Sequence, residues 1–177
     1  MSNYGGSSYP QTAPPAHGGA PADAAVPKAF PIVAIVGAVL VLACTWVNWV
    51  VGEAGGETGG VKGKDGDGVI TLIVSIVAAL ALIGAMVTKK ALLYLGGAVL
   101  SLVTVVFAVI NMVDPARLVA AKLESEGASS AEAEKYAEQV VKAADFSAGP
   151  GLYMVLIGAL LTVVFGVLGF MKSRNSR

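Results

Sequence analysis

Charge, cysteine and histidine are all scarce in this sequence. Only 14% of its 177 residues are charged and 55% are hydrophobic, whereas about a quarter of the residues in ordinary soluble domains are charged. Twelve basic and twelve acidic residues cancel, so the net charge favours neither nucleic acid nor an anionic partner. The single cysteine, Cys44, excludes an internal disulfide. These shortages indicate that lipid, rather than water, surrounds most of the chain.

Charge is missing altogether from four long apolar runs. They cover residues 30–51, 69–87, 91–113 and 152–171. At a helical rise of about 1.5 Å per residue each run spans about 29 to 35 Å, close to the thickness of about 30 Å of a bilayer's hydrocarbon core. Helices of soluble proteins normally keep a polar stripe, which these runs lack. We therefore expect an all-α fold, a bundle of four transmembrane helices.

The missing intramembrane charges also exclude several functions. Proton relays, ion pathways and coupled transport usually need an ionisable group inside the membrane. Hydrolysis there would need a buried histidine or paired carboxylates, but the one histidine, His17, lies outside the runs. Asp65 and Asp67 lack the further ligands of a calcium loop. We expect no enzyme activity, no cofactor and no metal site.

The distribution of charge predicts the orientation of the chain in the plasma membrane. Segments 1–28, 88–90 and 172–177 hold six basic residues against one acid, whereas segments 52–68 and 114–151 hold six basic residues against eleven acids. The more positive side of a membrane protein faces the cytoplasm. Both termini are therefore predicted to be cytoplasmic, with the other two segments outside.

Three of the segments between and beyond the runs are predicted to have little structure. Residues 1–28 are rich in Gly, Pro and Ala and read as a disordered tail. The run that follows is too long for a signal peptide and is expected to be retained. Loop 52–68 contains eight glycines, which predicts a flexible solvated loop, with Asp67 capping the next helix. Residues 172–177 form a short basic tail.

Segment 114–151 is predicted to form two helices outside the membrane. Asp114 and Pro115 are a typical helix start and Gly127 a typical stop. Ser129 and Glu132 have the spacing of a capping box for the second helix. That helix has a narrow apolar face made of Ala133, Tyr136, Ala137, Val140, Val141 and Ala144. The hairpin is expected to pack on the bundle, lie on the lipid or dock a partner. Its excess of acids weakens the lipid alternative.

Two groups of residues are candidates for function. The first is a set of exposed apolar side chains that would contact a partner: Tyr136, Val140, Val141, Trp46 and Trp49. The second is a polar cluster in the outer third of the bundle: Asn48, Thr71, Ser75 and Asn111. Such groups either hydrogen-bond between helices or line a small cavity open to the outside, able to hold a lipid headgroup or a partner's side chain.

Three features resemble small four-helix membrane proteins of Gram-positive, especially actinobacterial, bacteria. They are the Gly, Pro and Tyr-rich start Met1 to Pro10, the pair Asp67-Gly68 before the second run, and Gly149-Pro150-Gly151-Leu152 before the last. The resemblance implies no known activity. With the patterns above, it favours a non-enzymatic accessory or scaffolding subunit of a respiratory, secretion or envelope-assembly complex.

The partners expected for such a subunit are membrane lipids and other membrane-protein subunits, without nucleic acid or a small-molecule substrate. Two alternatives remain. One is a small carrier or channel, which would need a water-filled path through the bundle. The other is a sensor of an extracytoplasmic ligand, which would need a defined pocket between the outer hairpin and the helix ends.

Overall fold

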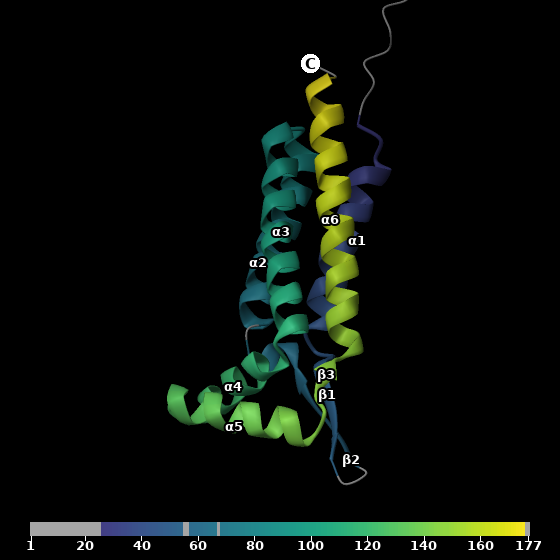
Figure 1. Ribbon diagram of the computed structural model, residues 1–177. Coiled ribbons are helices and arrows are strands. Elements are labelled where there is room, and N and C mark those ends of the chain that lie inside the picture. Colours follow the sequence, from purple (N-terminus) through teal and green to yellow (C-terminus); the bar gives the residue numbers. More distant parts are fainter. Residues whose placement is uncertain (1–25, 55–56, 67, 176–177) are drawn as a thin grey trace, which may run out of the picture.

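Four helices lie side by side in a long bundle, and a smaller cap covers one end of it (Figure 1). The computed structural model describes residues 26–54, 57–66 and 68–175. The bundle consists of α1 Ala29–Cys44, α2 Gly68–Thr88, α3 Ala91–Val113 and α6 Pro150–Asn175. Helix α6 packs on α1 and α3, and α2 packs on α3 and α1. The chain thus closes a ring in the order α1, α2, α3, α6.

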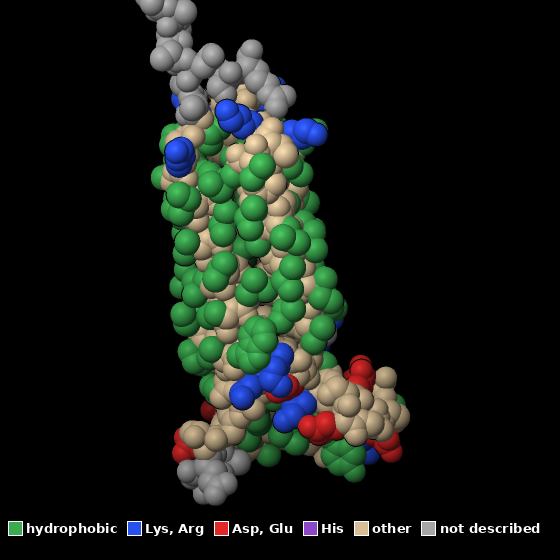
Figure 2. All heavy atoms as spheres, turned by 180° about the vertical axis from the view of Figure 1, so that it is seen from behind, with side chains coloured by type: hydrophobic (Ala, Val, Ile, Leu, Met, Phe, Trp, Pro, Cys, Tyr) green, Lys and Arg blue, Asp and Glu red, His purple; other side chains and the backbone are tan. Residues whose placement is uncertain are grey.

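The outer surface of the bundle is apolar and its interior is small and partly polar. Exposed side chains include Val36, Leu80, Val99, Val106 and Leu160, whereas alanines and hydroxyl residues are buried. The face of the bundle seen in Figure 2 carries a broad hydrophobic belt. By length and composition, α2, α3 and α6 can each cross a membrane, and α1 is a shorter apolar helix of 16 residues. The chain is therefore a largely helical membrane protein whose belt contacts lipid.

The first apolar run corrects the prediction of a helix over residues 30–51. Helix α1 ends at Cys44, and strand β1 begins at Asn48 and continues to Ala54. The Thr45 hydroxyl donates a hydrogen bond to the Leu42 carbonyl at 2.7 Å within the terminal turn. The residues beyond it, Val47 to Val51, are mainly β-branched or aromatic and favour a strand. Hydropathy alone does not separate a buried strand from a buried helix.

The glycine-rich loop is also more ordered than predicted. Strand β2, Glu57–Lys62, pairs antiparallel with β1, with Val50 opposite Val61, and strand β3, Ser147–Ala148, pairs with the other edge of β1. The order in the sheet is β2-β1-β3. This three-stranded sheet corrects the purely helical expectation. The predicted cap residue Asp67 and most of the predicted tail, residues 1–25, lie outside the described residues.

Two helices complete the cap, α4 Pro115–Ser125 and α5 Ser130–Ala143, and they pack against each other. Gly127 joins them with a φ of +105°, which favours glycine. The capping box predicted from Ser129 and Glu132 is present: the Ser129 hydroxyl donates to the Glu132 carboxylate at 2.6 Å. These hydrogen bonds lower the pKa of Glu132 from its ordinary value.

Helix α6 is longer than the apolar run that predicted it. It extends beyond residue 171 to Asn175, so Lys172 and Arg174 lie in its last turn rather than in a separate tail. The Arg174 guanidinium lies 5.7 Å from the centre of the Phe170 ring, within the range of a cation–π contact. Positive charge near the last carbonyls of a helix is favourable, which explains the extension.

Candidate interaction site on the cap

The cap is built on the C-terminal end of α1 and the N-terminal end of α6. Trp49, in β1, is fully buried, and its indole N–H donates to the Cys44 carbonyl at 3.0 Å. Gly63, in the 3-10 turn η1 Gly63–Asp65, lies against the same indole ring. On the other side, the Gly149 N–H donates to the Trp49 carbonyl at 2.7 Å, directly before α6 begins. The sheet therefore joins α1 to α6 through Trp49.

Helices α4 and α5 are held on this sheet by a small apolar core. Leu118 of α4 is fully buried, and Ala133 and Ala137 of α5 are buried at one helical turn's spacing. Small residues on one face let α5 lie close to α4. Gly66, directly after η1, lies beside α4, because a side chain at this position would contact Leu118 and Ala121. This packing fixes the direction of the remaining faces of both helices.

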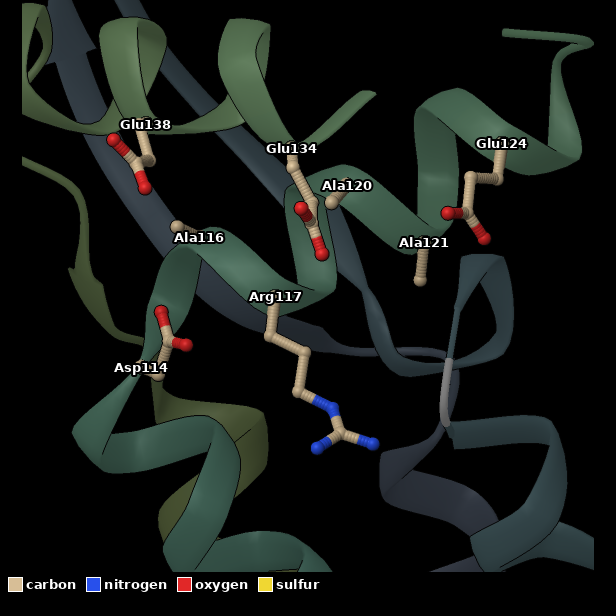
Figure 3. A pocket seen from close by; sticks show the side chains of 8 residues that line it. All are labelled: Asp114, Ala116, Arg117, Ala120, Ala121, Glu124, Glu134 and Glu138. Atoms are coloured by element: carbon tan, nitrogen blue, oxygen red, sulfur yellow. The ribbon is translucent and has the colours of Figure 1, made fainter. Parts of the chain in front are cut away.

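A half-open groove of about 550 Å³ lies between these faces and the start of α4 (Figure 3). Glu134 and Glu138, one turn apart on α5, point toward α4. Asp114, Arg117 and Glu124 contribute from the α4 side. The remaining lining is small and apolar: Ala116, Ala120 and Ala121. Four carboxylates and one guanidinium line the groove, so it carries a surplus of negative charge.

Chemically, this groove suits a cationic group. Its carboxylates are solvent-exposed side chains that accept hydrogen bonds from an ammonium or guanidinium group. The alanines leave room for the apolar stem of a lysine or arginine side chain. Within the described ranges, no cluster of three or more His, Cys, Asp or Glu side chains has the geometry of a metal site.

Some of the predicted contact residues are exposed in the structure, and others are buried. Tyr136 and Val140 are exposed on α5, at 59% and 41%, while Val141 is half-buried against the cap's core. The two tryptophans differ completely: Trp46 is 55% exposed and Trp49 is 0% exposed. Trp49 thus anchors the sheet instead of lying on the surface. The structure does not bring these five side chains together in one patch.

The residues of the predicted polar cluster also lie in two different places. Asn48 is half-buried in β1 beside Gly60, whereas Thr71, Ser75 and Asn111 are buried on the interior faces of α2 and α3. Thr104, which was not among the predicted residues, is buried with this interior group. Its spacing of seven residues from Asn111 places both on one helix face, and that signal was available in the sequence. The four-residue spacing of Glu134 and Glu138 likewise predicts that these two acids of the groove lie next to each other on α5.

An apolar helical bundle with a cap on one end defines a multi-pass membrane protein. Residues 31–177 match the model of the tryptophan-associated transmembrane protein family, so the chain belongs to that family. The match covers the bundle and the cap together. No curated protein and no solved structure matches the chain. The family description supports a membrane location and names no activity.

Proposed function

We propose that this chain is a non-enzymatic accessory or scaffolding subunit of a cell-envelope complex in the plasma membrane of an actinobacterium. Its bundle is the anchor and its cap is the contact surface outside the cell. The observation that carries the proposal is the acidic groove between α4 and α5, fixed to the bundle through Trp49. A groove of this charge favours a basic segment of another membrane-protein subunit, with lipids around the belt.

Four membrane crossings are part of this proposal. Helix α1 rises only about 24 Å over its 16 residues, yet it packs on α6 along its length. Gly37 meets Gly158 where the two antiparallel helices cross, which brings the end of α1 level with the first turn of α6. A short helix is accommodated by local thinning of the bilayer or by flanking side chains that reach the interface. Exposed Trp46, just beyond α1, suits that interface.

The positive charges support cytoplasmic termini. Lys89, Lys90, Lys172 and Arg174 all belong to the helix ends opposite the cap. Lys and Arg side chains are seen at both ends in Figure 2, whereas the Asp and Glu residues within the described ranges all belong to the cap. The positive-inside rule then puts the cap outside the cell.

Charge reversal in the groove tests the proposal. The tagged protein is purified from its native membrane in mild detergent, as the wild type and as Glu134→Lys with Glu138→Lys. The proposal expects defined membrane-protein partners with the wild type and their loss with the double variant. The matched control, Glu53→Lys with Glu126→Lys, makes the same charge change on exposed residues outside the groove and should keep the partners. Equal recovery from all three proteins would refute the groove as the contact.

A second candidate function, a sensor of a small cationic ligand, is favoured by the size of the groove. Its volume of about 550 Å³ lies within the range of about 300 to 1,000 Å³ typical of ligand sites. Titration of the purified protein with spermidine separates the two candidates. Saturable binding that the Glu134→Lys, Glu138→Lys variant loses would favour the sensor. The tight α1–α6 crossing and the uncharged runs give the carrier alternative no comparable support.

A further inference from the structure

Three oxygen atoms inside the bundle have no hydrogen-bond partner among the described residues. They are Thr71 Oγ1 on α2 and Thr104 Oγ1 and Asn111 Oδ1 on α3. Their residues are 0% to 2% exposed. Leaving a buried polar atom unpaired costs about 1 to 3 kcal/mol, and in a membrane interior no bulk water relieves that cost.

The three atoms belong to one stretch of the interior. Helices α2 and α3 are antiparallel, and a side chain on Gly97 would meet Leu82, which sets their register. From that contact, the helical rise puts Thr104 level with Ser75 and puts Thr71 between Thr104 and Asn111. The stretch starts at the cap end of the bundle, and Thr104 lies about 14 Å from the end of α3.

Two other buried hydroxyl groups in the bundle, those of Thr45 and Thr162, lie within hydrogen-bond distance of backbone carbonyls. The Thr162 hydroxyl lies 2.9 Å from the Gly158 carbonyl and 3.1 Å from the Ala34 carbonyl of α1. Thr45 donates to Leu42. At Asn111 only the amide N–H is used, donating to the Phe107 carbonyl at 2.9 Å. The Asn111 oxygen can only accept, so it requires a donor from elsewhere.

We propose that the interface between α2 and α3 holds an internal water site, bounded by Thr71, Ser75, Thr104 and Asn111. A buried water molecule typically makes about three hydrogen bonds. Because Thr104 and Asn111 are two helical turns apart, the site needs at least two waters. One donates to Asn111 Oδ1 and shares a hydrogen bond with the Thr71 hydroxyl, and the next shares hydrogen bonds with the Thr71 and Thr104 hydroxyls, which both donate and accept. The site lies in the cap-side half of the bundle, and Leu82 and Tyr94 fill the interior beyond it. It is a local hydrated pocket and does not extend through the bundle.

Water-to-protein magnetisation transfer in solid-state NMR tests this site directly. The full chain carries ¹³C-labelled threonine and asparagine and is reconstituted in phosphatidylethanolamine and phosphatidylglycerol vesicles. Exposed Thr58 is the wet reference, and Thr162, buried and paired with carbonyls, is the dry one. The water site requires Thr71, Thr104 and Asn111 to receive magnetisation several-fold faster than Thr162. Transfer at the rate of Thr162 would overturn it and would mean that the hydroxyls pair directly within the protein.

An Asn111→Leu variant sharpens the result. Loss of the Asn111 oxygen should reduce transfer to Thr71, which shares its water, to the level of Thr162, while Thr58 stays unchanged. Unchanged transfer at Thr71 would contradict a water held by Asn111. If this variant does not fold, Thr104→Val serves instead. Its expected effect is a fall in the thermal midpoint of about 2 to 4 °C, while an unchanged or higher midpoint would indicate a dry interface.

Discussion

The two helix pairs of the bundle are joined by different interactions. Where α1 crosses α6, Gly37 and Gly158 bring the backbones together, and the Thr162 hydroxyl reaches the Ala34 carbonyl across the interface. Between α2 and α3, three buried polar oxygens have no hydrogen-bond partner in the part of the chain that the structure describes. Close backbone contact and satisfied hydrogen bonds make the first interface rigid. The second retains polar groups that cost stability unless a solvent molecule occupies it.

This difference extends into the cap. Val41 and Cys44 of α1, Leu152 and Val155 of α6, and Trp49 of β1 belong to one hydrophobic cluster. The α1–α6 interface therefore continues through the membrane boundary into the sheet. Helix α3 joins the same cluster through Ala108, whereas none of the described residues of α2 belongs to it. We expect substitutions along the α1–α6 interface to have larger effects on stability.

The largest effect is expected at the cap end of that interface. Trp49→Ala removes a fully buried ring, and such truncations cost about 3 to 5 kcal/mol. Trp46→Ala, only three residues away, changes a side chain that is 55% exposed and should cost far less. Thermal unfolding of both variants in the same detergent measures the difference. Equal midpoints would mean that Trp49 does not anchor the cap.

The next effect is expected at the crossing itself. A Cβ atom on Gly37 would lie 2.5 Å from the Gly158 carbonyl oxygen, so Gly37→Leu forces α1 away from α6. Overpacking of this kind costs about 1 to 3 kcal/mol. Gly96→Leu on α3 is the matched control, because nothing lies within 4 Å of its Cβ position. Size-exclusion chromatography after graded heating should show early loss of the first variant, and similar profiles would count against a tight crossing.

A smaller effect is expected from the hydrogen bond between the helices. Thr162→Val removes the donor to Ala34 and Gly158, and interhelical hydrogen bonds in membranes are worth about 0.6 kcal/mol on average. Thr88→Val is the control, since its hydroxyl is exposed and donates within its own helix. The thermal midpoint should fall slightly more for Thr162→Val. The reverse order would contradict a stabilising contact between α1 and α6.

The smallest effect concerns the start of α5 and depends on pH. The hydrogen bonds from Ser129 lower the pKa of Glu132, so they stabilise the folded helix above the ordinary pKa of the carboxyl group. That contribution is lost as pH falls through the lowered pKa. Hydrogen exchange of residues 130–143, corrected for intrinsic rates, should show weaker protection at acid pH. Neither helix pair carries an acid in its apolar run, so both should remain protected. A Glu132→Gln variant should lose the pH dependence, and its persistence there would exclude Glu132 as the cause.

The sequence predicts most of this fold, because long uncharged runs leave few alternatives to membrane helices. The capping residues Pro115 and Ser129 also mark where α4 and α5 begin. The sheet was missed because Val47 to Val51 is equally apolar as a helix end or as a strand. Its pairing with residues 57–62 and 147–148 depends on tertiary contacts. The groove was missed for a related reason: its acids come from two helices, and only packing brings them together.

Site-specific photo-crosslinking in native membranes tests most directly whether the cap, and not the bundle, makes the protein contacts. A photoreactive amino acid replaces Ala121, which lines the groove, or Val106, which is exposed on the apolar belt. If the cap carries the function, irradiation yields discrete protein adducts from position 121 and lipid adducts alone from position 106. Protein adducts from position 106, with none from position 121, would show that the bundle is the contact surface.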